Sequence, residues 1–136
     1  MAPSGHLLVS CKTSSRRLRV IAMSINANGT TVTRRGDSGN QAGTIGRNSI
    51  TARPYGAISS VSTSSGKLRT IKWNVSNTGQ ITRAGDSADQ AGKSGILDVV
   101  ALPGVANAPL VTPVQTSGKL KLICWDDLSS SGELQR

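Results

Sequence analysis

The 136-residue chain contains no phenylalanine, and aromatic residues make up only 2% of it. A hydrophobic core must therefore be built from Val, Ile, Leu, Ala and two tryptophans, and each aliphatic side chain buries little apolar area. Two cysteines, Cys11 and Cys124, lie too far apart for a disulfide framework or a metal-ligand motif. With one histidine and no nucleophile–base pair, acid–base chemistry has few options, so we expect a non-enzymatic protein without catalytic residues, metal or cofactor.

Long hydrophobic runs are also missing. No stretch approaches the roughly 20 apolar residues of a membrane-spanning helix. Residues 1–10 do not combine a basic segment with an apolar one, so the sequence predicts no secretory signal. We expect a cytoplasmic protein of about one domain that makes no contact with membranes.

Basic charge is abundant and unevenly spread. The formal net charge is +9, and residues 1–53 carry eight Lys and Arg against one Asp, whereas residues 54–136 carry eight against six acids. A surplus of this size attracts nucleic acid or other polyanions. Most of these basic residues stand singly along predicted strands, which favours a solvated basic surface over an evolved polyanion site.

An internal repeat is the strongest signal in the chain. Residues 33–43 and 82–92 share the pattern T-R-x-G-D-S-x-x-Q-A-G, 49 positions apart. A preceding L-[RK]-x-I-x-[MW] pattern occurs three times, at residues 18–23, 68–73 and 120–125. Repeats with a period near 50 residues are typical of propeller blades or solenoid units.

Alternating apolar residues and turn residues predict eleven short strands and no helix, with four strands in each full unit. The predicted strands are Leu7–Cys11, Leu18–Ile25, Thr30–Arg34, Asn48–Arg53, Ala57–Val61, Lys67–Val75, Gln80–Ala84, Ile96–Leu102, Leu110–Val114, Lys119–Asp126 and Glu133–Arg136. Four strands per unit of about 50 residues favour an all-β propeller. At the fixed blade position of Trp73 and Trp125 we expect core packing between blades rather than a platform for sugar rings.

The predicted blades do not fill a ring. We divide the chain into an N-terminal strand (5–13), blade 1 (14–63), blade 2 (64–116) and a C-terminal half blade (117–136). Two and a half blades leave open sheet edges, so we expect a homodimer in which the N-terminal strand pairs with the C-terminal hairpin of the partner. Two copies would close a six-bladed ring.

The units resemble a largely uncharacterised family of bacterial β-propeller repeats, with the pattern S-G-x-L-x-x-I-x-W followed by G-x-I-T-R-x-G-D-S-x-x-Q-A-G. The second unit carries all of it, from Ser65 to Gly92, and the resemblance covers nearly the whole chain. The first unit departs from it at Met23, where the others have Trp, and the third ends at Arg136. The resemblance implies the propeller fold, whereas a fold of this kind implies no particular activity.

The candidate site consists of polar residues that recur with the Gly-Asp-Ser turn. We expect the turn itself to be structural, with Gly in a conformation closed to other residues and with Asp and Ser bound to turn amides. The recurring Arg either pairs with the following Asp or forms, with Asp and Gln, a row of ligand-binding groups, one set per blade. The candidate ligand-binding residues are Arg34, Asp37, Gln41, Arg83, Asp86, Gln90 and Arg136.

Two functions follow from these features. The first is a binding module with repeated pockets for a small polar ligand or glycan, similar to a lectin, in which several weak sites add up to avidity. The alternative is a basic scaffold that binds nucleic acid or an acidic protein. Salt separates them, because polyanion binding weakens steeply with salt.

Overall fold

The described residues form eleven β-strands and no helix. The structure is a computed structural model that describes residues 5–53, 56–90, 92–95, 97–101, 109–127 and 134–135. The strands are β1 (Leu7–Lys12), β2 (Leu18–Ile25), β3 (Val32–Asp37), β4 (Ile45–Arg53), β5 (Gly56–Thr63), β6 (Leu68–Val75), β7 (Ile81–Asp86), β8 (Val100–Ala101), β9 (Leu110–Thr116), β10 (Lys119–Asp127) and β11 (Leu134–Gln135). The predicted all-β class and the order of the strands are confirmed.

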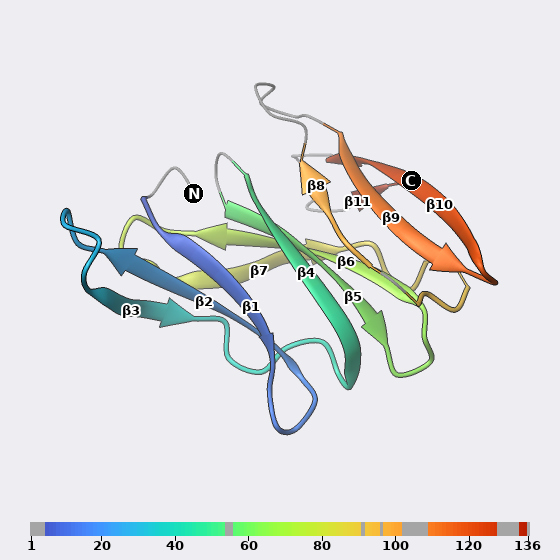
Figure 1. Ribbon diagram of the computed structural model, residues 1–136, viewed down its shortest axis with the longest axis horizontal. Helices are drawn as coiled ribbons and strands as arrows, with labels where there is room; N and C mark the ends of the chain where they lie inside the picture. Colours follow the sequence, from blue (N-terminus) through green and yellow to red (C-terminus); the bar gives the residue numbers. More distant parts are fainter. Residues whose placement is uncertain are drawn as a thin grey trace.

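The strands form three antiparallel sheets (Figure 1). The N-terminal sheet has the order β1-β2-β3, the central sheet β4-β5-β6-β7, and the C-terminal sheet β8-β9-β10-β11. Each is a meander in which strands adjacent in sequence are also neighbours in space. Short turns explain this order, as at Asn26–Gly29, where Gly29 has a φ of 71° and donates to the Asn26 carbonyl.

The sheets divide the chain differently from the repeat units. The central sheet takes β4 and β5 from the end of the first unit and β6 and β7 from the start of the second. The N-terminal strand β1 pairs with β2 of its own chain along its whole length, and the C-terminal sheet has four strands. The first and last described strands are therefore already part of sheets, and pairing of β1 with a partner chain stays a prediction.

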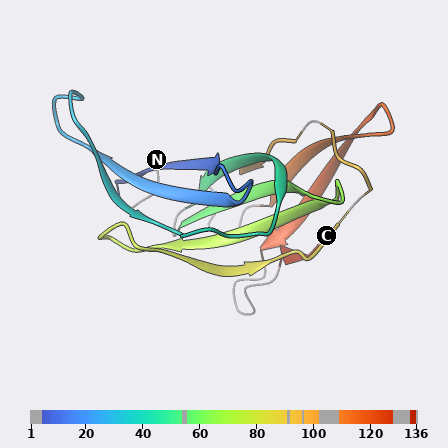
Figure 2. The same ribbon diagram turned by 90° about the horizontal axis from the view of Figure 1, so that it is seen from below.

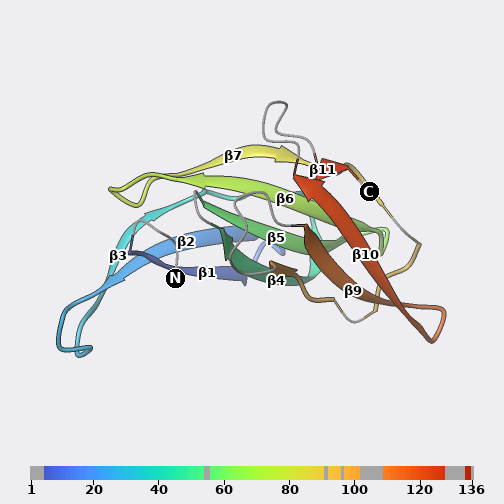
Figure 3. The same cartoon turned by 90° about the horizontal axis from the view of Figure 1, so that it is seen from above.

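The three sheets stack face to face, with the central sheet in the middle (Figures 2 and 3). We call the face of a sheet that points toward the next sheet along the chain its forward face, and the opposite face its backward face. In the C-terminal sheet, the forward face is the one that points away from the central sheet. Leu18, Val20 and Ala22 of β2 lie on a forward face and pack against Ile71 and Trp73 on the backward face of the central sheet. A second core between the central and C-terminal sheets combines Ile58, Leu68, Leu110, Val114, Ile123 and Trp125.

Both tryptophans are core residues between sheets, as predicted, with at most 1% of their surface exposed. Trp73 Nε1 donates a hydrogen bond to Ser59 Oγ at 2.8 Å, and Trp125 Nε1 donates one to Thr112 Oγ1 at 2.9 Å. A buried indole requires such an acceptor. In the N-terminal sheet Met23 stands at the position of Trp73, and Val9 at the position of its acceptor Ser59. The hydroxyl acceptor is therefore absent from the sheet that lacks the indole donor.

The glycine of the Gly-Asp-Ser turn differs from its prediction. Neither Gly36 nor Gly85 has a positive φ, so the expected conformation closed to other residues is wrong. Gly36 instead lies against the β6–β7 turn of the central sheet, where a Cβ would come within 2.5 Å of the Gly79 carbonyl oxygen. The absence of a side chain lets the edge strand β3 approach the neighbouring sheet.

Candidate functional site

Both described copies of the repeated motif form the same turn after an edge strand. Asp37 Oδ1 accepts a hydrogen bond from the amide of Gly39 at 2.6 Å, and Asp86 Oδ1 accepts one from the amide of Ala88 at 2.7 Å. Gly39 and Ala88 take the same left-handed backbone, with φ values of 64° and 53°. An aspartate bound to the amide two residues on is the usual closure of such a turn.

The serine of the motif ties the turn to the adjacent strand. Ser38 Oγ accepts from the amide of Val20, and Ser87 Oγ accepts from the amide of Thr70, each at 3.0 Å. Both hydroxyls in turn donate to the carbonyl of the following residue. The expected structural role of Asp and Ser is confirmed, because each side chain satisfies backbone groups that the ladder leaves unpaired.

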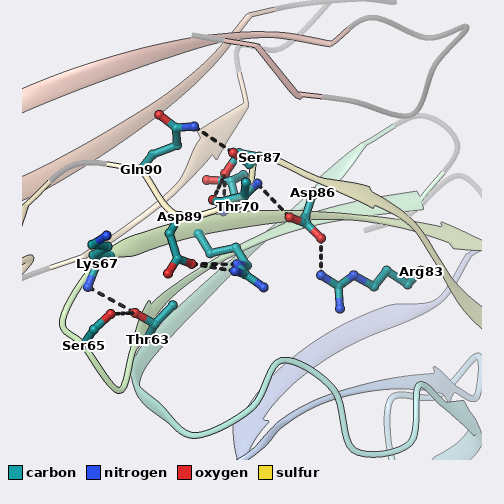
Figure 4. A network of polar contacts seen from close by, with 11 residues as sticks. Thr63, Ser65, Lys67, Thr70, Arg83, Asp86, Ser87, Asp89 and Gln90 are labelled. Carbon is teal, nitrogen blue, oxygen red and sulfur yellow. Dashed lines mark hydrogen bonds and ion pairs between the residues drawn. The ribbon is translucent and has the colours of Figure 1, made fainter.

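The motif glutamines complete this closure, and Figure 4 shows the second copy with Gln90. Gln41 Nε2 donates to the Ser38 carbonyl at 2.9 Å, and Gln90 Nε2 donates to the Ser87 carbonyl at 2.8 Å. The backbone of Gln90 exchanges hydrogen bonds with Leu68, as Gln41 does with Leu18. Each glutamine thus anchors the loop to the first residue of the neighbouring strand.

The motif arginines pair with the aspartates, as one of the two interpretations predicted. Arg34 forms an ion pair with Asp37, and Arg83 forms one with Asp86 through Oδ2. Both oxygens of each carboxylate are therefore used within the turn. The arginines keep spare N–H donors, and 51% of the Arg34 side chain is exposed. The third candidate arginine, Arg136, lies outside the described residues.

A polar hollow lies next to the motif, at the junction of the N-terminal and central sheets. Its volume is about 200 Å³. It lies between the loop after the first motif and the β5–β6 turn, and it is lined by Ala42, Gly43, Thr44, Thr63, Ser64, Ser65, Arg69 and Asp89. None of these eight was among the candidate site residues, although Ala42 and Gly43 end the predicted motif.

Arg69 and Asp89 form the charged wall of the hollow. Arg69 donates to Asp89 Oδ1 through Nε at 2.9 Å and through an Nη atom at 2.6 Å. About a third of each side chain is exposed, so both have free hydrogen-bonding positions toward solvent. Hydroxyls of Thr63 and Ser65 bond to each other at 2.9 Å on the opposite turn. The hollow thus offers a guanidinium, a carboxylate and hydroxyls to a polar molecule.

The same contact of loop and turn recurs between the central and C-terminal sheets. Gly92, the equivalent of Gly43, lies beside the β9–β10 turn, where a Cβ would be 3.7 Å from Thr116 Oγ1. Gly95 lies beside Gln115 of β9, and the amide of Gly95 donates a hydrogen bond to the Gln115 carbonyl at 2.8 Å. The repeat therefore brings its last glycine, Gly43 or Gly92, beside a strand turn of the next sheet at both junctions.

Metal ligands do not gather anywhere in the part of the chain that the structure describes, where no group of three or more His, Cys, Asp or Glu side chains occurs. Within that same part, no helix is long and apolar enough to cross a membrane. Comparisons of the chain with protein-family models, with curated proteins and with solved structures find no significant match.

Proposed function

We propose that the three sheets are blades of a β-propeller and that the protein is a non-enzymatic binding module for a small polar ligand, with carbohydrate as the favoured class. Two of the sheets have four strands and the N-terminal one has three, and stacked antiparallel meanders with a core between neighbouring sheets are typical of propeller blades. The observation that carries the binding function is the hollow lined by Arg69, Asp89 and the Thr63–Ser65 turn. Sugars present adjacent hydroxyls, and a guanidinium can donate a hydrogen bond to one while the paired carboxylate accepts one from its neighbour.

The repeat adds a second argument for binding. The hollow lies where the first copy of the motif meets the next sheet, and Gly92 of the second copy lies beside Thr116 at the other junction, so the repeat supplies a second place of the same kind. Sites of this kind are individually weak, because the hollow of about 200 Å³ is small and open to solvent at its charged wall. Several weak sites on one scaffold give useful avidity for a repetitive glycan.

A glycan array followed by titration with neutral mono- and disaccharides tests this function. Arg69→Ala should weaken binding of a positive sugar by about tenfold or more, since it removes one charged wall of the hollow. Arg19→Ala is the matched control, because Arg19 holds the equivalent place in β2, bonds to Asn40 at 2.9 Å and does not line the hollow. Absence of any sugar binding, or equal losses in both variants, would refute the proposal.

The alternative, polyanion binding, rests on the β1–β2 turn. Lys12, Arg16 and Arg17 are exposed there, and none forms an ion pair with another described residue. This alternative is tested by an electrophoretic mobility shift assay with single-stranded and duplex oligonucleotides at several salt concentrations. Binding that falls steeply with salt and is lost in an Arg16→Ala/Arg17→Ala variant, without any sugar binding, would favour this alternative.

A further inference from the structure

The forward face of the C-terminal sheet exposes large apolar side chains. Leu120 and Leu122 of β10 are 73% and 65% exposed, while Ile123 and Trp125 on the backward face of the same strand are buried. The exposed face is also hollowed beside Leu120, with a volume of about 260 Å³. The hollow is lined by Pro113, Val114, Gln115, Gly118 and Leu120. Isolated exposed leucines are ordinary, but a row of them over an apolar hollow indicates an interaction surface.

The equivalent positions in the other two sheets are fully buried. Leu68, the counterpart of Leu120, is 0% exposed because the C-terminal sheet covers it, and Thr70, the counterpart of Leu122, is likewise buried. In β2 the counterparts Leu18 and Val20 are covered by the central sheet. The forward face of a sheet is therefore built to be covered by another sheet of the same repeat.

The backward face of the N-terminal sheet is the complementary case. Val32 is 56% exposed and Ile25 44%, and both lie on this face opposite each other in the β2–β3 ladder. Their counterparts in the central sheet are Ile81, which is 6% exposed, and Val75, which packs against the same core. The central sheet buries these positions only because the forward face of the N-terminal sheet lies on them.

We propose that a second copy of this chain covers both exposed faces, with the forward face of each C-terminal sheet packed on the backward face of the partner's N-terminal sheet. The proposal rests on the propeller arrangement and not on the ligand. The chain itself shows which surface fits which, since the two exposed faces are the same pair of face types that form its two internal cores. A single contact would leave one exposed face on each copy, whereas a two-fold axis covers all four in one closed dimer.

This dimer differs from the one that the sequence predicted. There the N-terminal strand leaves its own chain to pair with the partner's C-terminal hairpin; here complete sheets stack and no strand is exchanged. The observed pairing of β1 with β2 and of β11 with β10 is kept. With three sheets from each chain, the closed ring has six.

Light scattering of the full chain tests the proposal directly. We expect a mass twice the 14.1 kDa of one chain, and Leu122→Asp should halve it without loss of β-structure, because this residue is exposed in the single chain. Asn77→Asp adds the same charge on the exposed β6–β7 turn and should leave the dimer intact. A folded monomer, polymers that grow with concentration, or a Leu122→Asp variant that remains dimeric would overturn the proposal and leave these faces to a different partner.

The two cysteines supply a second, independent measurement. Cys11 shares the backward face of Leu7 in the N-terminal sheet, and Cys124 shares the forward face of Leu122. Their counterparts Val61 and Ala22 are both buried in the core between the first two sheets. In the dimer, both thiols should react with a maleimide about tenfold or more slowly than in Leu122→Asp, because only accessible thiols react rapidly. Equal rates would contradict the stacking of these faces even if the mass were that of a dimer, and sugar binding is a separate readout.

Discussion

The N-terminal and central sheets carry the same repeat, yet one is covered on one face and the other on both. Trp73 occupies the position of Met23, and Ser59 that of Val9, and no other described sheet of the chain covers the backward face of the N-terminal sheet. By contrast, the Asp and Ser side chains that hydrogen-bond to backbone amides in the turn are identical in both copies. The comparison separates residues fixed by hydrogen bonds inside a sheet from residues that respond to the sheet next to them.

Truncation at the tryptophan position should give the largest difference in stability between the two sheets. Trp73→Ala should lower the free energy of unfolding by about 3–5 kcal/mol, because it opens a cavity between two sheets and leaves Ser59 without its indole partner. Met23→Ala, at the equivalent but partly exposed position, should cost about 1 kcal/mol or less. Urea unfolding followed by circular dichroism measures both.

The background for this measurement is Leu122→Asp, so that the proposed dimer contributes nothing. Equal losses at the two positions would mean that the faces of the two sheets are not different in their packing. The comparison is direct because both residues lie on backward faces, in strands that are paired on both sides.

The strands were predictable because the signals for them are local. Alternation and turn residues placed β2 correctly from Leu18 to Ile25, whereas the predicted Thr30–Arg34 became β3 from Val32 to Asp37. A β-bulge at Ala22 and Met23, where β3 has one extra residue, explains why this strand continues through Gly36. Which strands share a sheet was not predictable, because a repeat has the same sequence signal wherever its boundary is drawn.

A loss of stability of intermediate size is expected when the aspartate is removed from either of the two turns. Asp86→Ala should destabilise the protein by about 2 kcal/mol, because the amide of Ala88 loses a charged acceptor and Arg83 its partner. Asp37→Ala should cost nearly the same, since Gly39 and Arg34 make the equivalent contacts. Thermal melting in the same buffer provides the values. A loss confined to ligand binding, without any change in melting, would show that the turns serve the ligand and not the fold.

The candidate site was only partly predictable. The repeat singled out Asp, Ser, Arg and Gln, which the structure places in the turn, but the sequence pattern does not show which of their hydrogen bonds the turn itself uses. Arg69 and Asp89 are 20 residues apart and meet because the Leu68–Gln90 bridge sets their register. The available signal was the basic residue that follows Leu in every unit, at Arg19, Arg69 and Lys121.

The smallest expected effect comes from a position at which the two turns share a left-handed backbone but differ in residue. Gly39 and Ala88 both have a left-handed φ, which costs an L-residue about 1–2 kcal/mol and glycine little. Ala88→Gly removes that strain but adds freedom to the unfolded chain, which offsets about 0.4–1 kcal/mol of the gain. We therefore expect a net stabilisation of about 0.5–1 kcal/mol.

The reverse substitution can be made in the first turn, and it serves as a control for the Ala88→Gly measurement. Gly39→Ala introduces the same strain in the first turn, where open space around the Cβ leaves no steric clash, and should destabilise by a matching amount. The double variant should then unfold with nearly wild-type free energy, since the two sites lie in different sheets and share no partners. Effects of the same sign in both single variants would mean that the two turns, despite their common hydrogen bonds, do not hold a common backbone.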